Sequence, residues 1–178
     1  MHRLEIDLSD STRSVWEHLE LRLARHPSES DGFFGARILA YALSWAPDLV
    51  MGEDLSTPDA PALELRTPTL AIAHWIDIGV PSAKRLNLAT RSAERVSVFC
   101  HRDPANWLRE LSRDRVQAPD RVEVTLLDFR FAEAMGAALG RRGRWSLMRD
   151  EEMVQVVTET ETNDGILRSA TLESLLAG

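Results

Sequence analysis

The alternation of apolar and polar side chains predicts strands along much of the chain. Residues 2–9 place Leu4, Ile6 and Leu8 at every second position, which is typical of a strand with one buried face. A two-residue period or a β-branched apolar run predicts further strands over residues 16–23, 62–66, 70–78, 95–101, 121–127, 145–148 and 153–158. An Asn163-Asp164-Gly165 sequence predicts a hairpin turn close to the C-terminus.

Apolar positions spaced three and four residues apart predict helices between these strands. The predicted helices cover residues 29–45, 81–92, 105–112 and 129–139. Residues 47–61 are rich in Pro, Asp and Ser and are predicted to form a loop. This order of elements predicts an α/β fold in one domain over residues 1–178, with a mixed sheet flanked by helices and a C-terminal hairpin.

Length and composition limit the classes of protein to consider. The 178 residues suit one domain, and the single cysteine, Cys100, cannot form an internal disulfide. No apolar run approaches the roughly 20 residues that cross a bilayer, and the N-terminus lacks the apolar core of a targeting peptide, so we expect a cytoplasmic protein. The net charge of −7 argues against a protein that coats nucleic acid non-specifically.

Three acidic residues occupy positions from which a metal site could be built. Glu29 begins a predicted helix, Asp59 lies in the proline-rich loop, and Asp77 ends a predicted strand. Carboxylates from such positions could converge on Mg²⁺ or Mn²⁺, which would activate water for attack on a phosphodiester. Each residue also has a simpler interpretation: Glu29 as a helix-dipole partner, Asp59 as a turn residue, and Asp77 as a solvated strand end.

Several short motifs resemble the bacterial YaeQ family. They are Leu23-Ala24-Arg25-His26-Pro27-Ser28-Glu29, Arg37-Ile38-Leu39-Ala40, Trp75-Ile76-Asp77-Ile78-Gly79 with Pro81, and Val96-Ser97-Val98-Phe99. The match runs in order over about residues 1–130. The resemblance implies a restriction-endonuclease-like PD-(D/E)XK fold, with Glu29, Asp59 and Asp77 as the metal ligands.

The chain departs from that pattern at three motif positions. Gly79 stands where the superfamily has its lysine, Leu88 where the family has a lysine on the next helix, and Ala60 where the family loop has a glutamate. Lys84, the only lysine, lies one helical turn from Leu88 and is the candidate catalytic substitute, although a solvated surface lysine is the simpler interpretation.

These departures favour a YaeQ-like protein with a degenerate metal site that binds a nucleic acid or another protein. The alternative is an active Mg²⁺- or Mn²⁺-dependent nuclease or phosphodiesterase.

The basic side chains form one compact cluster in the sequence, and Arg109, Arg113 and Arg115 form a second, looser one on and after a predicted helix, which we interpret as a solvated helix face. Arg141, Arg142 and Arg144 could contact phosphate, but the following run from Asp150 to Glu152 is expected to weaken their field. We therefore interpret this cluster as a solvated turn.

Overall fold

The computed structural model describes residues 1–52 and 59–178, and the chain groups into two compact units. Unit 1 comprises Met1–Leu43 and Leu127–Arg168, and unit 2 comprises Ser44–Leu126 and Ser169–Gly178. Each unit is therefore built from two separate segments of the chain. The prediction of one domain over residues 1–178 stays a prediction.

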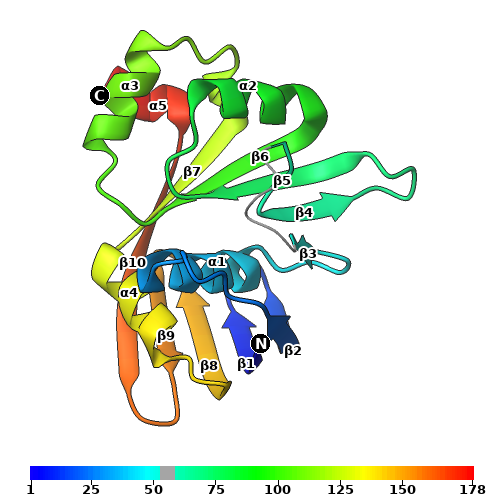
Figure 1. Ribbon diagram of the computed structural model, residues 1–178, viewed down its shortest axis with the longest axis vertical. Coiled ribbons are helices and arrows are strands. Elements are labelled where there is room, and N and C mark those ends of the chain that lie inside the picture. Colours follow the sequence, from blue (N-terminus) through cyan, green and yellow to red (C-terminus); the bar gives the residue numbers. More distant parts are fainter. Residues whose placement is uncertain (53–58) are drawn as a thin grey trace. The chain divides into compact units, whose positions relative to one another are not determined.

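Unit 1 contains a mixed sheet in the order β2-β1-β8-β9-β10 (Figure 1). Its strands are β1 (His2–Asp10), β2 (Val15–Leu23), β8 (Arg142–Asp150), β9 (Met153–Val157) and the first part of β10 (Thr162–Thr171). β1 pairs parallel to β8, whereas the β1–β2, β8–β9 and β9–β10 pairs are antiparallel. Alternate side chains along β1 are buried, as the two-residue period predicts.

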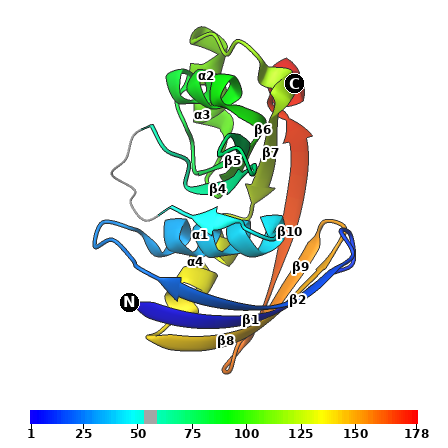
Figure 2. The ribbon, with the colours of Figure 1, turned by 90° about the vertical axis from the view of Figure 1, so that its right-hand side faces the viewer.

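Two helices cover the same face of this sheet, as Figure 2 shows. They are α1 (Asp31–Ser44) and α4 (Phe129–Ala138). A Cβ atom on Gly35 would overlap the carbonyl oxygen of Ala132, and one on Gly136 would overlap that of Asp31. Glycine at these two positions therefore allows the two helix backbones to touch.

Unit 2 contains the rest of the ten-stranded order, in which the end of β10 is followed by β7-β6-β5-β4-β3. Its other strands are β3 (Val50–Met51), β4 (Leu63–Arg66), β5 (Ile72–Ile78), β6 (Ala93–Cys100) and β7 (Val122–Leu127). β5, β6 and β7 are parallel, and β3, β4 and β5 are antiparallel. The α/β class and the mixed sheets flanked by helices agree with the prediction.

One face of the parallel strands carries the apolar core of unit 2. The helices α2 (Ala83–Ser92), α3 (Ala105–Arg113) and α5 (Leu172–Ala177) contribute to it, and a short 3₁₀ helix covers Pro119–Arg121. Trp75, Leu86, Val98 and Trp107 are among its buried side chains. The Trp107 indole donates a hydrogen bond to the carbonyl oxygen of Pro81 at 2.7 Å, which fixes α3 against the start of α2.

The structure corrects the prediction for the C-terminal segment. Asn163-Asp164-Gly165 lies inside β10, and the hairpin turn is formed by residues 158–161, where the Thr158 hydroxyl accepts hydrogen bonds from the Glu161 and Thr160 backbone. Gly165 is required in the strand because a Cβ there would overlap the ring of Phe131. Helix α5 follows β10 and was not predicted. The predicted loop over residues 47–61 contains β3, and its residues 53–58 lie outside the described part.

Candidate functional site

Asp77 and Arg85 form a bidentate ion pair between β5 and α2. The Arg85 Nε lies 2.7 Å from Asp77 Oδ2, and Arg85 Nη2 lies 2.7 Å from Asp77 Oδ1. Asp77 is 2% exposed, because its strand position turns the side chain toward the helices of unit 2. Arg85 also donates to the carbonyl oxygen of Ala60 at 2.7 Å, and its guanidinium lies 5.5 Å from the centre of the Trp75 ring. The guanidinium thus contacts both carboxylate oxygens.

A pocket of about 580 Å³ lies beside α2 and brings Asp59 and Lys84 together. Its lining residues are Asp59, Ser82, Lys84, Arg85, Leu88 and Arg91. Lys84, Leu88 and Arg91 share the outer face of α2, because positions three and four apart lie on one side of a helix. The placement of Lys84 one turn from Leu88 agrees with the prediction.

A second pocket of about 440 Å³ lies along the same helix and shares Ser82, Lys84 and Arg91 with the first. Its other wall is the segment after α3, which includes Asp114 and Arg115. The Asn87 amide donates to the carbonyl oxygen of Arg115 at 3.0 Å and accepts a hydrogen bond from the backbone of Gln117 at 2.9 Å. This side chain therefore fixes the segment that carries Arg115 against α2.

The cations of these two pockets differ in how they are neutralised. Arg85 is paired with Asp77, whereas the side chains of Lys84, Arg91 and Arg115 make no ion pair with any residue in the described part of the chain. All three are exposed at the pocket surface. A pocket with unneutralised cations favours an anionic ligand, and Arg and Lys side chains bind phosphate groups through charge-assisted hydrogen bonds.

The third predicted acid, Glu29, belongs to unit 1 and has its own ion pair there. Glu29 Oε1 lies 2.9 Å from the Nε of Arg37, and both side chains are buried. Glu29 Oε2 accepts hydrogen bonds from the His26 backbone at 2.9 Å and from Arg37 Nη2 at 3.1 Å. The helix begins at Asp31 and is capped by Ser30, whose hydroxyl accepts from Phe33. Glu29 thus fixes the segment that leads into α1.

The carboxylates of the three predicted metal ligands therefore differ in what they contact. Arginine contacts the carboxylates of Glu29 and Asp77, and only Asp59 faces a pocket. Within residues 1–52 and 59–178, no three His, Cys, Asp or Glu side chains are grouped so as to hold a metal ion. This donor set does not fit a divalent cation unless both arginines move, so the Mg²⁺ or Mn²⁺ site stays a prediction.

Comparison with known proteins identifies the family. The family model described as "YaeQ protein" matches residues 1–164. The chain belongs to the YaeQ family.

Solved YaeQ structures share the fold over nearly the whole chain. The crystal structure of YaeQ from Pseudomonas syringae is 28% identical, with a TM-score of 0.88 over 96% of this chain and 94% of that one. The YaeQ structure from Xanthomonas axonopodis pv. citri is 27% identical, with a TM-score of 0.87 over 96% of this chain and 97% of that one.

The curated YaeQ relatives match over a shorter region. YaeQ of Escherichia coli (strain K12) is 31% identical over 106 residues, and YaeQ of Salmonella typhi is 30% identical over 105 residues. The matched region covers 59% of this chain and 58% of each relative's own length. No helix among the described residues is both long and apolar enough to span a membrane.

Sequence reasoning missed Arg85 and Arg91 in this YaeQ-family site. A signal for Arg85 was present, since a buried strand-end carboxylate needs a cation and the following helix carries an arginine in its first turn. Arg115 was identified only as part of a basic cluster with Arg109 and Arg113, and it reaches the pocket because Asn87 holds its segment against α2.

Two buried histidines of unit 2 lie outside these pockets. Burial lowers the pKa of His74 to about 4, and its Nε2 lies 2.8 Å from the Ser97 hydroxyl. Burial also lowers the pKa of His101 to about 4 and raises the pKa of the Cys100 thiol. All three side chains are buried, and burial favours the neutral imidazoles and the protonated thiol.

Proposed function

We propose that this YaeQ-family chain binds a phosphate-bearing ligand in the α2 pockets and does not hydrolyse it with a metal ion. The observation that carries the proposal is the set of unneutralised cations, Lys84, Arg91 and Arg115, in two adjoining pockets of a chain with net charge −7. A ligand phosphate would supply the charge partner that these side chains lack. The pocket of about 580 Å³ falls in the size range of small-molecule sites.

The Asp77–Arg85 pair supports the second part of the proposal, that the chain does not hydrolyse its ligand with a metal ion because its PD-(D/E)XK-like site is degenerate. A guanidinium that contacts both oxygens of a carboxylate takes the positions that a metal ion would need. Gly79, two residues further along, has φ +93°, a conformation that side chains other than glycine rarely adopt. A lysine in that place would strain the backbone, which agrees with its absence.

Calorimetric titration with inorganic phosphate, pyrophosphate and a nucleoside diphosphate tests the binding. Lys84→Ala and Arg91→Ala are each expected to weaken binding about tenfold or more, because a charge-assisted hydrogen bond contributes about 1.5–3 kcal/mol. Arg113→Ala is the matched control, since Arg113 is an exposed arginine of α3 outside both pockets. No binding of any of the three probes, or equal losses in the control, would contradict the proposal.

The alternative, a Mg²⁺- or Mn²⁺-dependent nuclease, is favoured by one observation: Asp59 and Lys84 line the same pocket. It requires Arg85 to release Asp77. In that case Mn²⁺ should raise the melting temperature of the wild type but not of Asp77→Asn, since a ligand that binds only the folded state stabilises it. Nucleic acid cleavage that Asp77→Asn abolishes would establish the alternative.

A further inference from the structure

Three arginines stand side by side on the sheet of unit 1, on the face opposite α1 and α4. Arg3 on β1 is directly opposite Arg22 on β2 and is also in register with Arg142 on β8. All three are exposed, while their neighbours Leu4 and Leu23 are buried, so the three side chains share the outer face. We call these residues the arginine row.

Like charges at directly opposite positions of a sheet destabilise it, so the arginine row has a cost. Neighbouring strands lie about 4.8 Å apart, which places the Cα atoms of the three arginines within roughly 10 Å. No described residue forms an ion pair or a side-chain hydrogen bond with Arg3, Arg22 or Arg142. Glu5 and Glu20 occupy the next outward positions, about 6.8 Å along their strands, and reduce the field only partly.

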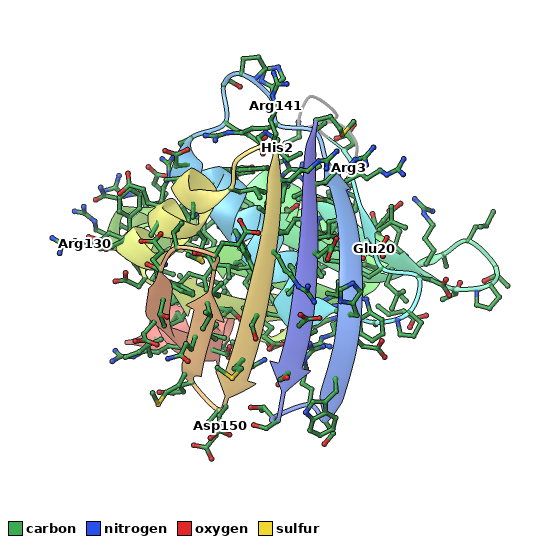
Figure 3. The ribbon with its side chains drawn as sticks, turned by 90° about the horizontal axis from the view of Figure 1, so that it is seen from below. His2, Arg3, Glu20, Arg130, Arg141 and Asp150 are labelled. Carbon is green, nitrogen blue, oxygen red and sulfur yellow. The ribbon has the colours of Figure 1, made fainter. Side chains whose placement is uncertain are left out.

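Arg141 adds a fourth arginine at the same end of the sheet, and two hydrogen bonds fix the backbone there. The carbonyl oxygen of Arg141 accepts a hydrogen bond from the Arg3 backbone at 2.9 Å, and the His2 ring lies 2.7 Å from the carbonyl oxygen of Gly140. Figure 3 shows Arg3, His2 and Arg141 together at one end of the strands. The backbone that carries these cations is therefore held in place before any ligand arrives.

The acidic run that was expected to weaken this cluster lies elsewhere. β8 is one continuous strand from Arg142 to Asp150, so Asp150 is about 26 Å from the arginine row. Figure 3 shows Asp150 at the opposite end of the sheet from Arg141. Arg144, the other member of the sequence cluster, lies 3.3 Å from Asp7. The expectation from the sequence was wrong because the strand separates the two charge runs.

We infer that the arginine row binds the sugar-phosphate backbone of single-stranded nucleic acid. Guanidinium groups form bidentate hydrogen bonds with phosphate, and a polyanion would offset the repulsion within the row. A flexible single strand can adjust the spacing of its phosphates to a fixed row of cations, whereas a rigid duplex presents them at a fixed spacing. The net charge of −7 means that the attraction is local to this end of the sheet.

A protein partner fits this surface less well than a nucleic acid. Protein interfaces depend on a few anchors, most often Trp, Tyr and Arg, that are buried in well-packed, desolvated pockets. Met1 is exposed next to the row, but the large exposed hydrophobics of the strands, Trp16, Met148, Met153, Val157 and Ile166, lie further along from it. The row offers charge without a pocket, which suits sequence-independent contact with phosphates.

Fluorescence anisotropy with a labelled 20-nucleotide oligothymidine at several salt concentrations tests the inference. Three phosphate contacts on a single strand predict that log K falls with log salt with a slope of about −2. Arg22→Ala and Arg142→Ala should each flatten the slope by about 0.7. Their melting temperatures should stay unchanged or rise, because repulsion within the row is relieved. The double variant Arg22→Glu/Arg142→Glu should abolish binding.

The matched control is Arg130→Glu/Arg168→Glu, which changes the net charge equally at exposed positions on α4 and β10. It should retain binding. Absence of binding at low salt, or equal losses in this control, would overturn the inference. Displacement by polyglutamate as readily as by unlabelled oligothymidine would assign the row to an acidic peptide instead.

This inference stands apart from the proposed function of the α2 pockets. Lys84→Ala/Arg91→Ala should leave oligonucleotide binding by the arginine row intact. If that variant alone loses the oligonucleotide, the pockets bind nucleic acid and the inference about the row is wrong.

Discussion

Arg85 contacts both carboxylate oxygens of Asp77, each at 2.7 Å, at the end of the strand that carries the most family-like motif of the chain. The carboxylate is nearly inaccessible, while the guanidinium remains about one quarter exposed. Removal of Arg85 would therefore leave a buried carboxylate without its partner, whereas removal of the Asp77 charge would leave a guanidinium that is partly exposed. This difference leads to a first prediction.

Arg85→Gln should lower the free energy of unfolding by about 3 kcal/mol, because it leaves a charged carboxylate buried without its partner. Asp77→Asn should cost less, about 1–2 kcal/mol, since the remaining guanidinium can reach water. Urea denaturation measures both. The exposed pair of Arg95 and Glu123 supplies the control, and Arg95→Gln should cost under about 0.5 kcal/mol. Equal effects of Arg85→Gln and Arg95→Gln would contradict the buried pair.

Gly79 connects β5 to the segment before α2 with φ +93°. Gly79→Ala should lower the free energy of unfolding by about 1–2 kcal/mol, because a Cβ disfavours this conformation. Gly79→Asn should cost less than Gly79→Ala, since asparagine tolerates positive φ better. A Cβ at this position would have no atom within 4 Å, so any loss reflects the backbone and not a clash. An alanine variant as stable as the wild type would refute this assignment.

The contact between α1 and α4 should be intolerant of any side chain. Gly35→Ala and Gly136→Ala are each expected to cost about 3 kcal/mol, because the added methyl meets backbone of the other helix and not a movable side chain. Gly140→Ala serves as the control, as its nearest neighbour atom would be 3.9 Å away. Thermal denaturation should separate the two buried glycines clearly from Gly140.

Stability should fall as the pH is lowered from about 6.5 toward 4. His74 and His101 have pKa values lowered to about 4 by burial, so between these pH values the unfolded chain binds protons that the folded chain does not. Each histidine can contribute a slope of up to about 1.36 kcal/mol per pH unit. Urea denaturation between pH 5 and 7 measures this slope while limiting the contribution of carboxylates.

Substitution assigns the slope to particular residues. His74→Gln should remove about half of it, and His101→Gln should remove the other half. A wild-type protein whose stability is constant from pH 5 to pH 7 would show that neither buried histidine is held neutral.

Periodicity predicts the elements here because each strand or helix buries one face, so apolar side chains recur at a regular spacing among neighbouring residues. The strand over residues 70–78 is an example: its alternation correctly separates Trp75, in the helix-covered core, from His74 on the other face. The turn predicted at Asn163-Asp164-Gly165 was wrong because Gly165 is needed inside a strand. A Cβ there would overlap the ring of Phe131, which is distant in the sequence.

The candidate sites were less predictable for the same reason. The arginine row joins residues 3, 22 and 142 through strand register, and no local pattern contains that pairing. The pairing of Asp77 with Arg85 likewise depends on how α2 packs on β5. Asp59 was identified as the acid of the proline-rich loop and Lys84 as the only lysine, one turn from Leu88, and the structure brings them to one pocket.

The two-segment construction of each compact unit bears on how the polypeptide reaches its native state. Unit 1 needs residues up to Arg168, and unit 2 needs the segment after it, where Leu172 is fully buried. During synthesis, therefore, neither unit can complete its fold before its second segment has been translated. The apolar faces of the earlier strands therefore stay exposed until the segments up to Arg168 and around Leu172 leave the ribosome.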